Sequence, residues 1–87
     1  MAWRILLDDG AKKYLRRVPK SDSERILRAI KGLVADPYGG DIEKMQGEEN
    51  VWRRRIGSYR FLYEIYQSTR MVYVFDIERR SSSTYSR

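Results

Sequence analysis

The spacing of apolar residues changes from a helical period to a strand period near the middle of this 87-residue chain. In the first half, apolar side chains recur every three or four positions in two runs: Ala11, Tyr14, Leu15 and Val18, then Ile26, Leu27, Ile30, Leu33 and Val34. In the second half, three segments are rich in β-branched and aromatic residues, as strands are: Val51–Ile56, Arg60–Tyr66 and Met71–Ile77. The sequence therefore predicts two helices followed by a three-stranded meander.

Helix-capping residues, prolines and glycines indicate where these elements begin and end. Trp3–Leu7 alternates as a short first strand, and one of the two aspartates that follow it caps the first helix. Pro19 ends that helix, and the tetrad Ser21–Glu24 predicts a capping box at the start of the second. Asp36–Gly40 ends the second helix, and a tight turn at residues 57–58 joins the first two strands of the meander.

The predicted order is β-α-α-β-β-β, an α+β fold in which a two-helix hairpin packs on one face of an antiparallel sheet. The other face of such a sheet is left open to water and ligands. A chain of 87 residues builds one compact core, so residues 1–87 are expected to form a single domain. The polar tail, residues 81–87, is expected to be flexible.

The residues that the chain lacks exclude several kinds of site. It has no cysteine, which excludes disulfides and thiolate metal sites, and no histidine, which removes the usual proton shuttle at neutral pH. We expect no metal and no other cofactor. No apolar run approaches the roughly 20 residues that cross a bilayer, so we expect a cytoplasmic protein without membrane contact.

The charged residues favour a polyanionic partner. The net charge is +6, from 18 basic and 12 acidic residues. Residues 44–87 hold nine of the basic residues, and eight of those nine are arginine. A planar guanidinium matches phosphate in a bidentate geometry, whereas the lysine ammonium is a point charge. An arginine-rich half therefore suggests a partner that carries phosphates.

Alternation within the strands predicts which arginines share the open face. Phe61, Tyr63 and Ile65 form an apolar set that suits the helix-covered side, so Arg60 points the other way. In the preceding strand, residues 52 and 56 suit the core, and Arg53 and Arg55 then share the open face with Arg60. This cluster has two interpretations, a solvated surface or a phosphate-binding site.

Arg54 falls in register with core residues in the same strand. An unpaired buried charge is unfavourable, so its guanidinium is expected to reach out at a sheet edge or to pair with a carboxylate. Beyond the last predicted strand, Arg79 and Arg80 add two more cations, and Tyr85 contributes a phenol a few residues later.

Four segments of the chain together resemble the RelE/ParE toxin superfamily: Gly39–Gly47, Val51–Glu64, Val72–Val74 and Ile77–Arg80. Their common pattern is a lysine three residues before the last glycine of the first segment, then Trp-Arg-x-Arg-Ile-Gly-x-Tyr-Arg in the second. The resemblance implies a curved sheet backed by helices, similar to microbial ribonucleases. It also implies the activity of the RelE branch, which cuts messenger RNA in the ribosomal A site without a metal. There the 2′-hydroxyl attacks the adjacent phosphate and leaves a 2′,3′-cyclic phosphate and a 5′-hydroxyl.

The resemblance assigns roles to residues by position. It implies a catalytic set of Arg55, Arg60, Arg80 and Tyr85, and a set of RNA contacts at Lys44, Arg53 and Arg79. Arginines at 60 and 80 would clamp phosphate oxygens as negative charge grows, and the tail phenol would accept the 2′-hydroxyl proton.

Two departures from the family pattern bear on the chemistry. Some members have lysine where this chain has Arg53 and Arg55, and arginine is a poor proton donor because its pKa exceeds 12. Glu78 stands in a position where a glycine is common, and its carboxylate could pair with an arginine and weaken phosphate binding. Two alternatives therefore stay open, a ParE-like inhibitor of DNA gyrase and a non-catalytic RNA-binding or ribosome-binding module.

The resemblance also implies protein partners. A cognate RelB-like antitoxin would mask the basic face, and the apolar stripes of the two helices offer a docking groove if they do not pack on the sheet. A heterotetramer of two toxins and two antitoxins is one assembly that the resemblance allows. The ribosome and its messenger RNA complete the expected set of partners.

Overall fold

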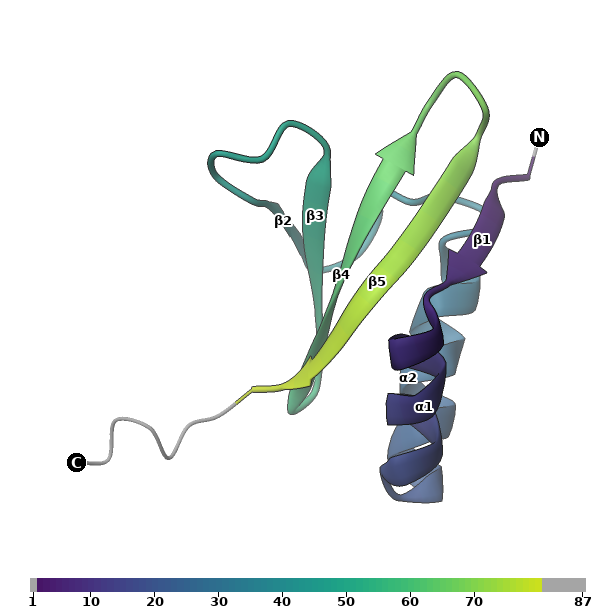
Figure 1. Ribbon diagram of the computed structural model, residues 1–87, viewed down its shortest axis with the longest axis vertical. Coiled ribbons are helices and arrows are strands. Elements are labelled where there is room, and N and C mark those ends of the chain that lie inside the picture. Colours follow the sequence, from purple (N-terminus) through teal and green to yellow (C-terminus); the bar gives the residue numbers. More distant parts are fainter. Residues whose placement is uncertain (1, 81–87) are drawn as a thin grey trace.

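The computed structural model describes residues 2–80 of the chain. Its seven elements are β1 (Arg4–Leu7), α1 (Asp9–Arg17), α2 (Lys20–Gly32), β2 (Ile42–Lys44), β3 (Val51–Ile56), β4 (Tyr59–Tyr66) and β5 (Met71–Arg79). The strands form one sheet in the order β1-β5-β4-β3-β2. In Figure 1 this sheet fans out from β2 on the left to β1 on the right, and the two helices run together below β1. The predicted α+β class, with a helical hairpin on an open sheet, is confirmed.

The sheet differs from the prediction in two ways. It contains β2, a three-residue strand that pairs with β3, and a segment that short shows no alternation that a sequence pattern could reveal. It is also mixed, because β1 runs parallel to β5 whereas the other neighbours are antiparallel. The direction of an edge strand depends on how the chain returns to it through the helices, which local patterning does not encode.

The helix boundaries confirm one predicted cap and correct another. Asp8 caps α1, since its carboxylate accepts a hydrogen bond of 2.9 Å from the Gly10 backbone N–H. Helix α2 begins at Lys20, directly after Pro19, and no side chain caps it. The predicted capping box at Ser21–Glu24 is therefore wrong, because these residues already lie inside the first turns of the helix.

The core lies between the helices and the sheet. It is formed by apolar residues of α1, α2, β4 and β5, including Leu15, Ile26, Ile30, Phe61, Tyr63, Ile65, Val72, Val74 and Ile77. The apolar stripes of both helices are thus covered by the sheet. They do not form the docking groove that the sequence left open.

A bulge in β5 decides which of its side chains face the open side. Leu62 of β4 pairs with Asp76, and the next residue, Tyr63, pairs with Val74, so one residue of β5 is extra. The extra residue reverses the alternation. Val74 before the bulge and Ile77 after it therefore both face the helices, and Asp76 faces the open side of the sheet.

Candidate functional site

Four arginines meet in one pocket on the open face of the sheet. The pocket has a volume of about 100 Å³ and is lined by Asp41, Glu43, Arg53, Arg55, Arg60 and Arg80. Two of the arginines come from β3, one from β4 and one from the residue after β5. Arg55 and Arg60 stand directly opposite each other in the β3–β4 register. We call these four residues the arginine pocket.

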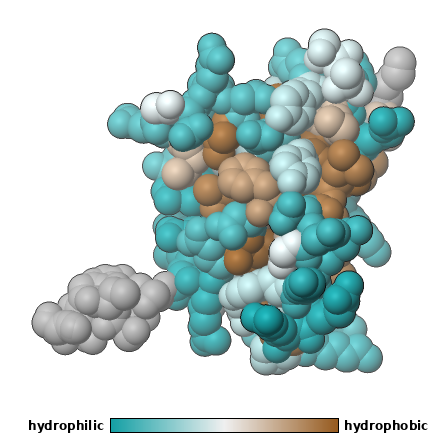
Figure 2. All heavy atoms as spheres, in the orientation of Figure 1, coloured by the Kyte–Doolittle hydropathy of each residue, from teal (hydrophilic) through white to brown (hydrophobic). Residues whose placement is uncertain are grey.

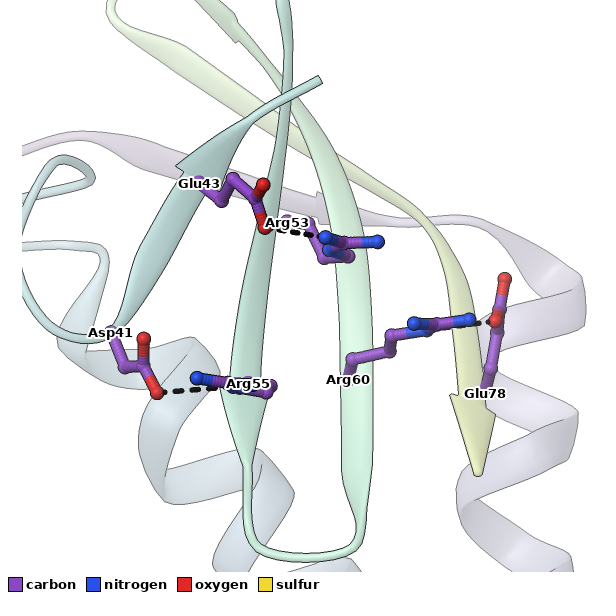
Figure 3. A network of polar contacts seen from close by, with 6 residues as sticks. All are labelled: Asp41, Glu43, Arg53, Arg55, Arg60 and Glu78. Carbon is purple, nitrogen blue, oxygen red and sulfur yellow. Dashed lines mark hydrogen bonds and ion pairs between the residues drawn. The ribbon is translucent and has the colours of Figure 1, made fainter. Parts of the chain in front are cut away.

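Each of three pocket arginines has one carboxylate partner, as Figure 3 shows. Glu43 pairs with Arg53, and Asp41 Oδ2 lies 3.3 Å from Arg55 Nε. Glu78 Oε1 lies 3.0 Å from Arg60 Nε. The pocket therefore balances four guanidinium groups against three carboxylates, which leaves one net positive charge. These carboxylates also explain how two arginines can stand side by side, since like charges in direct register repel.

The sequence anticipated only one of these carboxylates, Glu78. Asp41 directly precedes β2 and Glu43 lies within it, and the pairing of Glu43 with Arg53 in the β2–β3 register places Glu43 on the open face. A strand of three residues is too short for its alternation to be recognised in the sequence, so neither carboxylate could be assigned to this face.

Arg80 reaches the pocket through contacts with the β3–β4 turn. Its backbone N–H donates to the Ser58 carbonyl at 2.6 Å, and its Nη1 donates to the Gly57 carbonyl at 3.0 Å. Gly57 has φ +60°, which a glycine adopts without strain. The tight turn thus fixes the end of β5 beside β3 and β4.

The structure does not bring two of the predicted RNA contacts to the pocket. Arg79 is the last residue of β5 and pairs with buried Tyr59, so it lies on the helix side, where its guanidinium sits 5.7 Å from the Tyr59 ring centre. Lys44 pairs with Trp52, which also places it on the helix side of β2. Both placements follow from strand alternation. The predicted tail phenol, Tyr85, lies outside the described residues.

Several tyrosines of the described chain have a pKa above the ordinary value, which disfavours the phenolate form. Burial raises the pKa of Tyr63 to about 12, and its hydroxyl donates to the Pro37 carbonyl at 2.9 Å. A hydrogen bond to Asp8 raises the pKa of Tyr73, and one to Asp22 raises that of Tyr59. None of these phenols lines the arginine pocket.

Asp76 and Glu78 form a carboxyl pair beside the pocket. Burial and a hydrogen bond with Glu78 raise the pKa of Asp76 from 3.8 to about 6. The same hydrogen bond, together with the guanidinium of Arg60, holds the pKa of Glu78 below its ordinary value of 4.5. Asp76 therefore keeps its proton at mildly acidic pH, and Glu78 accepts the hydrogen bond as a carboxylate. Asp76 could not be identified from the sequence, because no pattern of residue types predicts the bulge that turns it to the open face.

The carboxyl pair gives a pH dependence of stability. Between pH 4.5 and about 6, folded Asp76 binds its proton more tightly than the unfolded chain does, so the free energy of unfolding should fall as the pH rises through this window. Below this window the lowered pKa of Glu78 has the opposite effect, so its contribution to the free energy of unfolding increases as the pH rises. Urea denaturation at a series of pH values measures the slope. Asp76→Asn should remove this decline and Glu48→Gln in an exposed loop should keep it; an unchanged slope in Asp76→Asn would contradict the assignment.

Apolar side chains gather on the same open face, beside the pocket. Leu6 is 51% exposed and Tyr66 38%. Tyr73 and Phe75 stand with their ring centres 6.2 Å apart, and Leu62 faces the same side of the neighbouring strand. Figure 2 shows brown side chains over β5 and β1 with hydrophilic residues around them. We call these five residues the open-face patch.

The described residues hold neither a cluster of metal ligands nor a membrane-spanning helix. Within residues 2–80, no three histidine, cysteine, aspartate or glutamate side chains come together as metal ligands could. None of the helices in that range has the length and apolarity to cross a membrane.

Comparisons with known proteins agree on one family. Residues 5–83 match the family described as "ParE toxin of type II toxin-antitoxin system, parDE". A curated protein of Methanocaldococcus jannaschii, "Putative toxin RelE1", is 26% identical over 86 residues, which are 95% of this chain and 96% of the relative.

Solved structures share the fold. The RelE–RelB complex of Pyrococcus horikoshii OT3 contains a chain with a TM-score of 0.81 and 23% identity, covering 95% of this chain and all of that one. The isolated RelE toxin of E. coli has a TM-score of 0.82 and 19% identity, covering 98% of this chain and 93% of that one. The family match spans nearly all the described residues and confirms the resemblance in the motifs: the chain belongs to the ParE toxin family, within the RelE/ParE superfamily of type II toxin–antitoxin systems.

Proposed function

We propose that this toxin is a metal-independent endoribonuclease of the RelE type, which cleaves messenger RNA on the ribosome in the cytoplasm. The observation that carries the proposal is the arginine pocket, in which four guanidinium groups converge from β3, β4 and the residue that follows β5. Cleavage of a phosphodiester through its own 2′-hydroxyl needs charge stabilisation and in-line positioning more than a covalent intermediate. A compact group of arginines supplies both.

The proposed reaction assigns a task to each part of the pocket. The 2′-hydroxyl loses its proton as its oxygen bonds to phosphorus, and negative charge grows on the two non-bridging oxygens. The bond from phosphorus to the 5′-oxygen breaks, and the 5′-oxygen takes a proton from water and leaves as a hydroxyl. Arg60 and Arg80 would grip the non-bridging oxygens, with Arg55 opposite Arg60 to complete the clamp. Arg53 would hold a neighbouring phosphate. Tyr85 is proposed as the acceptor of the 2′-hydroxyl proton on the family pattern alone.

The three ion pairs do not close the pocket to RNA. Their side chains are 28–67% exposed, and exposed ion pairs contribute only about 0–1 kcal/mol each. A phosphate offers several acceptor oxygens, so it can form bidentate hydrogen bonds with more than one guanidinium group at once. A phosphate that accepts from several guanidinium groups at once can therefore displace the carboxylates, which until then hold the arginines in place.

We further propose a cognate RelB-like antitoxin as the protein partner. Solved relatives from Pyrococcus horikoshii and Mycobacterium tuberculosis are toxin–antitoxin complexes. In this chain the open-face patch, with Leu6 and Tyr66 exposed, offers apolar area beside the arginine pocket. A partner seated on the patch would bury that area and cover the basic residues together. A heterotetramer stays a prediction.

The family description also favours a second candidate, inhibition of DNA gyrase, because the matched family takes its name from ParE. The two functions require different residues. RNA cleavage depends on the arginine pocket, whereas gyrase inhibition has no need of a phosphate clamp on the open face. Non-catalytic binding to RNA or the ribosome would use the pocket without cutting.

Induction of the toxin in growing cells separates these functions. Mapping of messenger 5′ ends by primer extension should reveal new ends inside reading frames within minutes. The double substitution Arg55→Ala and Arg80→Ala should abolish them, and Arg16→Ala on the exposed face of α1 should leave them in place. Intact messages with damaged DNA would point to gyrase instead. Salt-sensitive ribosome binding without cleavage would identify the non-catalytic module.

A further inference from the structure

A second group of arginines lies on the helix side of the sheet, away from the arginine pocket. A groove of about 390 Å³ runs between α2, β3 and the loop that follows α2. Arg25 and Arg28 reach it from α2, and Arg54 reaches it from β3. Because Arg54 alternates with Arg53 and Arg55, the two groups of arginines lie on opposite faces of the sheet. We call this feature the helix-side groove.

Arg54 is unusual because one of its donors has no protein partner. Its Nε is buried and makes no hydrogen bond within residues 2–80. The predicted carboxylate partner is also absent from the described chain, where no ion pair to Arg54 is found within 4.0 Å. A buried donor left unpaired is unfavourable, so native proteins rarely keep one without a reason.

The loop after α2 is shaped to admit this guanidinium. Gly40 has φ +88°, and a Cβ atom there would lie 2.6 Å from Arg54 Cζ. A side chain at this position would displace the guanidinium from its place in the groove and would also strain the backbone at this positive φ. Gly40 therefore leaves the space into which the Arg54 side chain extends along the groove.

The charges of the groove are unbalanced toward the positive. Three arginines face one carboxylate, Asp36, which leaves two net positive charges. That carboxylate already accepts a hydrogen bond of 3.0 Å from the Tyr38 backbone N–H. Arg25 has a partner on its own helix, Asp22, at 3.4 Å, but the pair is exposed and therefore weak. The groove thus resembles an anion site more than a structural ion-pair network.

The remaining wall of the groove is apolar. Ala29 of α2 and Ile56 of β3 line it beside the arginines. A site that combines cations with a short apolar surface suits a ligand with a charged group and a flat or apolar body. A nucleotide has this composition, with its phosphate for the guanidinium groups and its base or ribose for the wall.

We propose that the helix-side groove is a second phosphate-binding site, which takes a nucleotide with its phosphate against Arg54 and Arg28. The phosphate oxygen accepts the hydrogen bond that Arg54 Nε does not make within residues 2–80. The same chemistry is offered by a free nucleotide and by one unit of an RNA chain. A peptide with carboxylates could pair with the guanidinium groups, but it would place no flat base or ribose against the apolar wall.

Nuclear magnetic resonance tests the site directly through the Nε–H resonance of Arg54. Titration of the purified toxin with uridine 5′-monophosphate should shift this resonance to saturation. Arg28→Gln should weaken the binding about tenfold, the effect of one lost charge-assisted hydrogen bond. Arg16→Gln removes the same charge from α1 and should leave the affinity within about twofold. Arg54→Met removes the reporter group, so its binding is followed through the backbone amide of the adjacent Gly40, and no shift is expected there. Arg28→Gln gives the answer if that variant fails to fold.

Further ligands identify the source and can overturn the proposal. Saturation by uridine 5′-monophosphate supports a free nucleotide site, and saturation only by a uridine hexanucleotide supports an RNA chain. An Arg54 resonance that moves with neither ligand would overturn the proposal. The proposal would also fail if a glutamate hexapeptide shifted the Arg54 resonance at lower concentrations than either nucleotide ligand. That result would identify the groove as a site for an acidic peptide. Because the readout is binding at Arg54, it stands apart from RNA cleavage at the arginine pocket.

Discussion

Replacing Arg60 with alanine is expected to slow RNA cleavage by about 100- to 1,000-fold, the usual effect of removing one donor from a charge-stabilising site. Arg60 stands opposite Arg55 in the β3–β4 register, and its side chain is only 35% exposed. A partly desolvated guanidinium stabilises growing phosphate charge more strongly than one in free water. The substitution leaves Glu78 without its cation, which adds repulsion to the loss. Single-turnover cleavage on programmed ribosomes measures the effect.

Two matched variants show whether this loss comes from the site. Arg4→Ala removes an arginine from the open face at β1, outside the pocket, and should change the rate by less than about threefold. Arg60→Lys keeps the charge but loses the planar fork, so its rate should fall between those of the native chain and Arg60→Ala. A cleavage rate for Arg60→Ala within threefold of the native rate would remove the arginine pocket from the mechanism.

The parts of the fold that the sequence predicted are those in which one local pattern fixes the structure. In β4, Phe61, Tyr63 and Ile65 alternate with polar or exposed residues, and all three are buried. The same alternation placed Arg60 on the open face, and the two-residue turn at Gly57 fixed the register with β3. The gathering of Arg53, Arg55 and Arg60 could therefore be predicted, because it follows from period and register alone. Arg80 joins them only because of the bulge in β5.

The features that could not be predicted depend on tertiary structure. The bulge in β5 turns Asp76 toward the open face, whereas uninterrupted alternation from Val72 and Val74 would have turned it to the core. The short strand β2 brings Asp41 and Glu43 to the arginines, but three residues carry no period. The site thus has more negative charge than the sequence analysis expected, and Glu78 was the one carboxylate that adjacency in the chain could reveal.

Arg54 is a charged residue at a position where strand alternation predicts an apolar core residue, and this exception was informative. Its position in register with Trp52 and Ile56 predicted burial, and the structure buries its Nε among helix-side residues. Of the two compensations expected for Arg54, a carboxylate pair is absent within residues 2–80, where Asp36 accepts a hydrogen bond from a backbone N–H in its own loop. The side chain instead reaches outward into the helix-side groove. A polar residue at a core position is more often explained by function than by stability, since stability alone would favour an apolar side chain there.

Replacing Phe61 with alanine is expected to lower the free energy of unfolding by about 3–5 kcal/mol, the usual range when a large buried aromatic is truncated. Phe61 has no exposed surface, and its ring lies 5.6 Å from that of Tyr63 in the middle of β4. The next residue, Leu62, faces the open side and is partly exposed, so Leu62→Ala should lower stability by about 1 kcal/mol, less than half as much. Urea denaturation measures both variants, and the slope of each curve reports whether the transition stays two-state.

The comparison of Phe61→Ala with Leu62→Ala tests which side chains of β4 face the helices and which face the open side. Small domains are stable by only about 5–15 kcal/mol, so the Phe61 variant should lie close to unfolding at growth temperature. It would then lose toxicity without any change in the arginine pocket, whereas Arg60→Ala should lose activity with its stability kept. Equal destabilisation by Phe61→Ala and Leu62→Ala would mean that β4 has no covered side, and with it the argument that places Arg60 on the open face would fail.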